Sequence, residues 1–278
     1  MEEAVQSDPR GVSLGALHRH NVNVRGATDG QPIVFAHGFG CDQNMWRHVW
    51  PAFGDDYRIV LFDHVGNGGS DASAFDPRRY ATLDGYAEDV LDVCRELGLG
   101  DVIFVGHSVS AMIGVLAAAA DPERFARLVL VGPSPRYIDD AGYIGGFSEE
   151  DVAGLLDSLE SNYLGWSRTM APVIMGNAQR PELGEELTNS FCRADPEIAA
   201  HFARVTFQSD NRDDLERVPV PSLVLQCSED PIAPEPVGRY VADRIPTAEL
   251  ALLSATGHCP NLSAPAETID AIKSFLAA

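Results

Sequence analysis

The chain has 278 residues, of which 45% are hydrophobic, and its formal net charge at pH 7 is −21. This length and apolar content suffice for one large domain, or for one domain with an insertion. An acidic surface repels phosphate backbones and anionic lipids, and no apolar run approaches the roughly 20 residues of a membrane span, so we expect neither nucleic acid nor a membrane as a partner.

Strand-like and helix-like segments alternate along the first half of the chain. Residues 1–11 are expected to form a disordered tail, and Val22 and Val24 to belong to an early edge strand. Buried strands are then predicted at 32–36, 57–62, 102–105 and 127–131, with helices at 43–53, 82–97 and 109–120 between them. Such alternation predicts an α/β fold with a mostly parallel, doubly wound sheet covered by helices on both faces.

The pattern changes between residues 134 and 209, where no strand-like run occurs. Four amphipathic helices are predicted there, at 148–163, 166–174, 182–192 and 195–205. We expect this all-helical insertion to lie over the carboxyl edge of the sheet as a cap. The core would then consist of residues 12–133 and 210–278, and the cap of residues 134–209.

Alternation resumes after the cap. The predicted elements are a strand at 221–227, a helix at 236–245, a last strand at 249–253 and a closing helix at 266–277.

The candidate nucleophile lies where the strand 102–105 meets the following helix, in the string Gly106-His107-Ser108-Val109-Ser110. A serine on a sharp strand-to-helix turn exposes its hydroxyl at the carboxyl edge of the sheet, beside the unpaired N–H groups of the new helix. Ser108 is therefore the candidate nucleophile. Ser110 stands where this motif usually ends in glycine, and His107 is expected to point into the protein.

Two further residues complete a catalytic set. Asp230 follows the strand 221–227 and His258 follows the last strand, which gives the order serine, acid, histidine of the α/β-hydrolase arrangement. Because the carboxyl ends of parallel strands converge on one edge, we expect Ser108, Asp230 and His258 to meet there. His258 would take the serine proton, and Asp230 would orient the imidazole and stabilise its charged form. Glu229 is an alternative acid.

The backbone N–H groups of Phe39 and Val109 are the candidates for an oxyanion hole. Phe39 lies in a His-Gly-Phe-Gly turn after the strand 32–36, and acyl transfer needs such donors where negative charge develops on a carbonyl oxygen. The glycine-rich stretch 63–71 lacks the Gly-Lys-Ser/Thr ending of a phosphate-binding loop, so it is interpreted as a tight structural loop.

The sequence predicts no metal ion and no cofactor. Its eight histidines form no metal-binding helix motif, and its five cysteines are far apart and never in a Cys-x-x-Cys pair. Reduced thiols, and a start without the apolar region of a secretory signal, indicate a cytoplasmic protein.

Five strings together carry a family resemblance. They are residues 37–43, 62–71, 106–114, 131–137 and 257–260. On the basis of these strings, the chain resembles the RsbQ-type bacterial α/β-hydrolases from about Leu17 to its end. Those proteins are regulators of the energy-stress response, and they are similar to plant strigolactone and karrikin receptors.

The resemblance implies the same triad, a four-helix V-shaped cap and a small buried apolar pocket. Matching positions imply that Phe39, Trp166 and Phe207 line that pocket, although ordinary packing in the cap would equally account for them.

Two functions follow. The catalytic set indicates an esterase or lactonase that cleaves a small apolar ester or lactone through an acyl-serine intermediate. The resemblance implies, alternatively, a signalling module that captures a hydrophobic small molecule and acts on a sensor phosphatase. Serine at position 108 argues against dehalogenases and epoxide hydrolases, whereas lyases, perhydrolases and cofactor-free oxygenases with the same triad stay open.

Overall fold

The computed structural model describes residues 15–278, so the predicted tail at 1–11 and the first residues of the predicted core lie outside it. Seven strands form one sheet in the order β1-β3-β2-β4-β5-β6-β7. Their bounds are β1 Asn23–Gly26, β2 Gln31–Ala36, β3 Tyr57–Leu61, β4 Val102–His107, β5 Phe125–Val131, β6 Ser222–Glu229 and β7 Ala248–Thr256. Only the edge strand β1 is antiparallel to its neighbour. The predicted mostly parallel α/β fold is confirmed.

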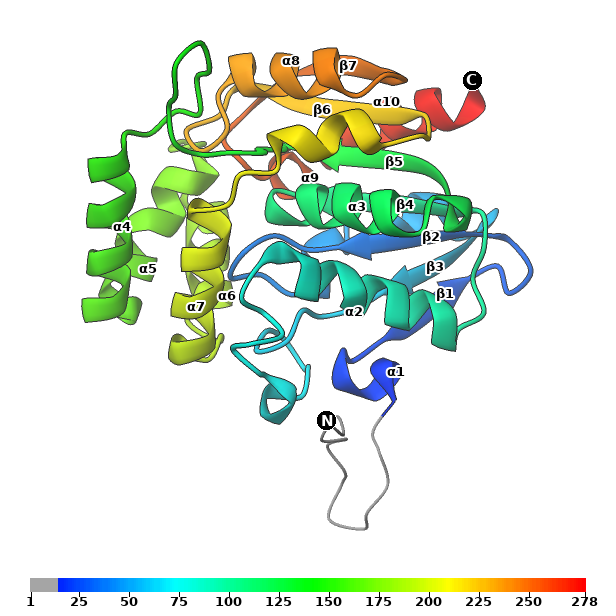
Figure 1. Cartoon of the computed structure of the whole chain (residues 1–278), viewed down its shortest axis with the longest axis horizontal. Helices are drawn as coiled ribbons and strands as arrows, with labels where there is room; N and C mark the ends of the chain where they lie inside the picture. Colours follow the sequence, from blue (N-terminus) through cyan, green and yellow to red (C-terminus); the bar gives the residue numbers. More distant parts are fainter. Residues whose placement is uncertain (1–14) are drawn as a thin grey trace.

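Both faces of the sheet are buried because successive side chains of each strand point to opposite sides. In β2, Ile33 and Phe35 belong to one hydrophobic cluster, whereas Val34 and Ala36 belong to the other. The helices α2, α3 and α8 cover the second cluster, and α10 covers the first (Figure 1). The bounds of the core helices are α1 Ala16–Arg19, α2 Leu83–Glu96, α3 Val109–Ala120, α8 Glu235–Arg244, α9 Pro260–Ser263 and α10 Pro265–Ala277.

The prediction of a single helix at 43–53 is wrong. The segment forms two short 3-10 turns, Gln43–Trp46 and Trp50–Phe53. Pro51 has no N–H to donate and its ring crowds the carbonyl four residues earlier, which disfavours one continuous helix through this segment. The segment still buries Trp46, which is fully enclosed against the sheet.

Four helices follow β5 and precede β6, and together they lie beyond one end of the sheet (green to yellow in Figure 1). They are α4 Glu149–Ser161, α5 Tyr163–Met175, α6 Pro181–Phe191 and α7 Pro196–Phe207. Side chains define their starts: Ser148 and Asp151 form a reciprocal capping box before α4, and Asp195 accepts two backbone N–H groups at the start of α7.

The C-terminal end of α5 is hydrogen-bonded to the loop after β7. Ile174 O accepts the backbone N–H of His258 at 2.9 Å, and the Asn177 amide donates to Thr256 O at 2.9 Å. Arg180 adds a hydrogen bond to Ser263 O at 2.8 Å. The backbone of His258 is therefore held directly by one of the four helices.

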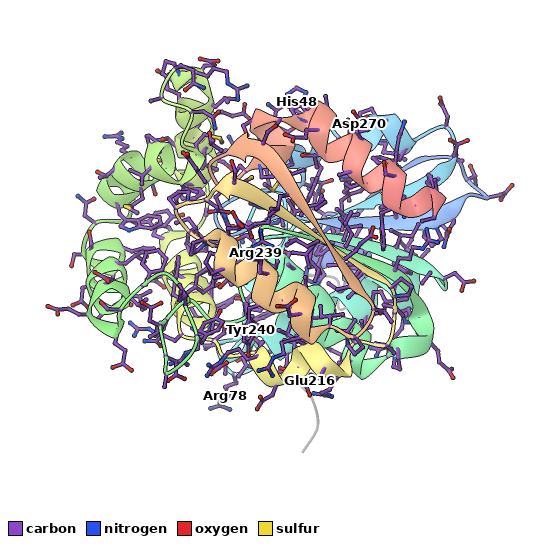
Figure 2. All side chains as sticks on the ribbon, turned by 90° about the horizontal axis from the view of Figure 1, so that it is seen from above. His48, Arg78, Glu216, Arg239, Tyr240 and Asp270 are labelled. Carbon is purple, nitrogen blue, oxygen red and sulfur yellow. The ribbon has the colours of Figure 1, made fainter. Side chains whose placement is uncertain are left out.

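Charged side chains project from the outer helices, as Figure 2 shows for Glu216, Arg239 and Asp270. Arg239 pairs with Glu235 one helical turn earlier, at 2.6 Å. Across residues 15–278, no helix combines the length and the apolar character needed to cross a bilayer.

We predict that Gly106→Ala destabilises the fold. A Cβ at Gly106 would lie 2.4 Å from the backbone oxygen of Ser110, so the substitution must push α3 away from β4. The expected loss is about 1–3 kcal/mol in the free energy of unfolding, measured by urea denaturation.

Gly100→Ala is the matched control. A Cβ at Gly100 meets no atom within 4 Å, so we expect no loss, or a gain of up to about 1 kcal/mol from the stiffer unfolded chain. Equal effects of the two substitutions would show that the contact between β4 and α3 is not tight.

Candidate active site

Ser108 occupies the turn between β4 and α3 in a backbone conformation that few non-glycine residues adopt, with φ 58° and ψ −123°. Its N–H donates to Val131 O at 2.8 Å, so the neighbouring strand β5 also holds the turn. The strained turn places the serine side chain at the N-terminus of α3, at the carboxyl edge of the sheet.

The structure brings Ser108, His258 and Asp230 together. His258 Nε2 lies 2.8 Å from Ser108 Oγ, and His258 Nδ1 lies 2.7 Å and 3.0 Å from the two carboxylate oxygens of Asp230. All three side chains are buried. Because a carboxylate only accepts hydrogen bonds, Nδ1 carries the proton and Nε2 is left to accept the serine hydroxyl.

Asp230, and not the neighbouring Glu229, faces the imidazole. Asp230 Oδ1 also accepts the backbone N–H groups of Ile232 at 2.8 Å and Ala233 at 3.0 Å, which hold the carboxylate in place. The side chain of Glu229 is exposed at the end of β6. The turn after β6 thus decides between the two candidate acids.

His107 points into the protein. Its Nε2 lies 2.7 Å from the carbonyl oxygen of His258, and burial, together with the nearby His258, lowers the pKa of His107 to about 3. At neutral pH it is therefore an uncharged donor that supports the backbone of His258.

The peptide between Gly38 and Phe39 is oriented by its carbonyl group. Gly38 O accepts from His37 Nδ1 at 2.8 Å and from Cys41 N at 3.2 Å. Since C=O and N–H point in opposite directions across a trans peptide, the Phe39 N–H points away from the His37 ring. Val109 is the first residue of α3, where N–H groups lack an acceptor within the helix.

A second buried serine–histidine pair lies behind this turn. Ser110 Oγ donates to His37 O at 2.5 Å and lies 2.7 Å from His64 Nε2. Because the one hydroxyl proton goes to His37, His64 must donate from Nε2, and its Nδ1 has no partner. Burial lowers the pKa of His64 well below its usual value. This pair has no carboxylate and braces the turn that contains Phe39.

A small cavity borders Ser108, with about 30 Å³ of space for the centre of a water-sized molecule. Phe39, Trp166 and Phe207 are among its lining residues. The others are Cys41, His107, Ser108, Tyr137, Ile174, Leu187, Phe191, Thr206, Ile232, His258 and Cys259. Burial raises the pKa of the Cys41 thiol to about 12, so Cys41 is not a competing nucleophile at neutral pH.

Sequence reasoning missed Tyr137 and Thr206. Tyr137 lines the cavity together with Ser108, and burial raises the pKa of the Tyr137 hydroxyl. Its position after β5 was an available signal, because loops that leave the other strand ends also carry site residues. Thr206 lies within a helix, where the sequence pattern carries no such signal.

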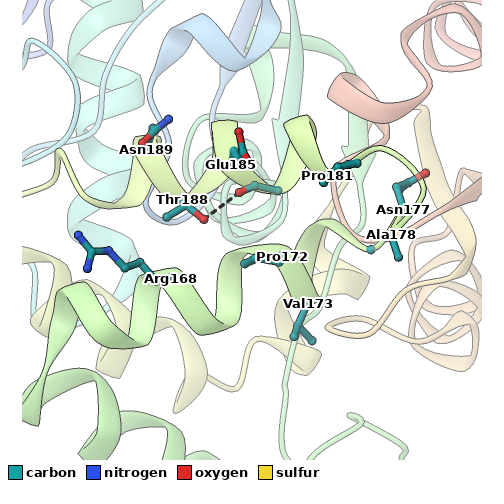
Figure 3. A pocket seen from close by; sticks show the side chains of 11 residues that line it. Arg168, Pro172, Val173, Asn177, Ala178, Pro181, Glu185, Thr188 and Asn189 are labelled. Atoms are coloured by element: carbon teal, nitrogen blue, oxygen red, sulfur yellow. Dashed lines mark hydrogen bonds between the residues drawn. The ribbon is translucent and has the colours of Figure 1, made fainter.

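A larger hollow of about 690 Å³ lies on the outside of the molecule between α5 and α6 (Figure 3). Its lining includes Arg168, Pro172 and Thr188 but no member of the Ser108–His258–Asp230 set. The site is therefore located by its chemistry and not by cavity size. Within the described part of the chain, no three His, Cys, Asp or Glu side chains are grouped so that they could hold a metal ion.

Residues 33–271 match the model of the Alpha/beta hydrolase family. The chain belongs to the α/β-hydrolase family. It is 40% identical over 247 residues to the Karrikin insensitive 2 receptor CA of Petunia hybrida, covering 88% of this chain and 91% of the relative. It is 38% identical over 266 residues to the Strigolactone esterase D14 of Arabidopsis thaliana, covering 94% and 99%.

A solved hydrolase from Oleispira antarctica superposes on this α/β-hydrolase with a TM-score of 0.91 and 37% identity, covering 94% of this chain and 96% of the other. The predicted similarity to plant strigolactone and karrikin receptors is confirmed. The protein is an enzyme of hydrolase type, which fits both these relatives and the geometry around Ser108.

We predict that acid weakens the fold partly through His107. Its pKa is about 3 when folded and about 6.5 when unfolded, so between these values the unfolded chain binds the extra proton. This contribution to stability is complete above pH 6.5 and decreases as pH falls toward 3. Urea denaturation at several pH values measures it.

His107→Gln keeps a donor for the carbonyl of His258 but does not titrate. We expect its free energy of unfolding to fall less steeply with pH than that of the wild type. Parallel curves for the two proteins would contradict the assignment.

Proposed function

We propose that this α/β-hydrolase is a carboxylesterase or lactonase that cleaves a small apolar ester or lactone through an acyl-Ser108 intermediate. The observation that carries the proposal is the hydrogen-bonded chain from Asp230 through His258 to Ser108, which ends at a mostly apolar cavity. The relative named Strigolactone esterase D14 supports ester hydrolysis.

In the proposed mechanism, His258 Nε2 takes the hydroxyl proton while Ser108 Oγ bonds to the carbonyl carbon. The N–H groups of Phe39 and Val109 stabilise the oxyanion, and each such donor contributes about 10²–10³ in rate. His258 returns the proton to the leaving alcohol, and Asp230 stabilises the charged imidazole meanwhile. A water molecule, deprotonated by His258, then attacks the acyl-serine carbonyl, and His258 returns the proton to Ser108 Oγ as the carboxylic acid leaves.

We also propose that the chain is divided into a core of residues 12–133 and 210–278 and a cap of residues 134–209. The support for this division is that α4 to α7 follow one another without a strand and supply Trp166 and Phe207 to the cavity wall. Because this cavity is small, we expect its wall to widen when substrate enters. The five cysteines, all free thiols, support the proposed cytoplasmic location.

A second candidate is an RsbQ-type signalling module that binds or slowly hydrolyses a hydrophobic small molecule and acts on a sensor phosphatase. The relative named as a karrikin receptor favours it. Co-purification of such a phosphatase with the ligand-loaded protein would support this role. Fast hydrolysis of many unrelated esters without any bound partner would count against it.

We predict that Ser108→Ala abolishes both labelling by a fluorophosphonate and hydrolysis of short-chain nitrophenyl esters, with a loss of about 10⁴-fold or more in kcat. Mass spectrometry of the wild type incubated with an ester should find the acyl group on Ser108. The trapped mass identifies the acid half of the substrate.

Ser110→Ala is the matched control, because Ser110 lies two residues away and has its own histidine neighbour. It should still be labelled on Ser108, with kcat lowered roughly tenfold through the lost brace on His37. Labelling that survives in Ser108→Ala but disappears in Ser110→Ala would assign the nucleophile to the other serine and overturn the proposal.

A further inference from the structure

The hydroxyl of Thr206 is an unusual feature of the cavity wall. Thr206 lies on α7, is 2% exposed and lines the cavity that contains Ser108. Its Oγ1 is buried and has no hydrogen-bond partner within the described residues. Buried hydroxyl groups are almost always hydrogen-bonded, because leaving one unpaired is unfavourable.

Several other hydroxyl groups within the long helices donate to the carbonyl group four residues earlier. Ser167 donates to Tyr163 O at 2.8 Å, and Thr268 donates to Ala264 O at 3.1 Å. Thr188 donates to Gly184 O at 2.8 Å, the bond drawn as a dashed line in Figure 3. Thr206 makes no such bond, so its hydroxyl keeps an unused hydrogen-bonding capacity next to the cavity.

Trp166 adds a second polar group to the same wall. It lies on α5, is 5% exposed, and its buried Nε1–H has no acceptor within residues 15–278. His107 Nδ1 is also unpaired, but the backbone of Gly38 covers it, so that a Cβ at Gly38 would lie only 2.5 Å from this nitrogen. His107 Nδ1 therefore does not face the cavity as a free polar group. Away from Ser108 and His258, Thr206 thus offers a free hydroxyl in a wall that is otherwise largely aromatic and aliphatic.

We propose that Thr206 determines specificity by hydrogen-bonding to a second oxygen of the substrate, one that is not part of the scissile ester group. The preferred substrate is then a compact apolar ester or lactone with one further carbonyl, ether or hydroxyl oxygen. This inference rests on the proposed esterase function, since Ser108 in the same cavity holds the reacting carbonyl.

The test compares ethyl hexanoate with its analogues in which one CH₂ of the acyl chain is replaced by oxygen. The measured quantity is the ratio of kcat/KM for an oxygen-containing analogue (an oxa ester) to kcat/KM for ethyl hexanoate. For at least one oxa ester, this ratio should be about 5- to 100-fold higher in the wild type than in Thr206→Val. Valine has the shape of threonine without the hydroxyl. Because the comparison is a ratio between two proteins, the intrinsic reactivity of each ester cancels.

Two variants serve as controls. Thr206→Ser restores a hydroxyl and should recover the preference. Thr268→Val removes an equally buried hydroxyl from α10, outside the cavity, and should leave the preference unchanged. A preference that is the same in the wild type and in Thr206→Val for every ester overturns the inference.

Binding of the same esters to Ser108→Ala separates this inference from the proposed function. Intrinsic tryptophan fluorescence reports it, because Trp166 lines the cavity. The esterase proposal fails if the wild type hydrolyses no ester. The role of Thr206 still stands in that case if Ser108→Ala binds an oxa ester more tightly than the double variant Ser108→Ala/Thr206→Val does. No discrimination in either measurement overturns the role of Thr206.

Discussion

A left-handed backbone at Ser108 connects β4 to α3, and the rest of the site is arranged around that turn. The close approach of β4 and α3, which only a residue without a side chain at Gly106 allows, holds the turn in place. The same geometry presents the serine hydroxyl to His258 and the first N–H groups of α3 to the same side. Backbone strain at one residue is thus compensated by packing on both sides of it.

Burial and hydrogen bonding give the histidines around this turn different tasks. His37, His64 and His107 are buried, and burial lowers the pKa of each. They are therefore neutral side chains that hydrogen-bond to neighbouring loops. His258 alone among the four is paired with a carboxylate, through Asp230. Its environment therefore suits a base that becomes positively charged during the reaction, whereas the other three suit fixed donors and acceptors.

The helices α4 to α7 act on the site in two ways. They supply Trp166, Thr206 and Phe207 to the wall of the cavity, and the end of α5 accepts the backbone N–H of His258. Any movement of α5 that admits a substrate therefore acts on the peptide group of His258 as well. The cavity wall and the backbone of His258 are thus connected through α5.

The amino-acid sequence was enough to predict the alternation of strands and helices, the turn at Ser108 and the order of Ser108, Asp230 and His258, because these depend on local periodicity and on where strands end. Contacts between distant segments bring Asp230 and not Glu229 to the imidazole, and they let Ser110 brace the turn containing Phe39. Only the tertiary structure showed the unpaired hydroxyl of Thr206. Such features depend on which side chains meet across distant segments, and no local pattern encodes that.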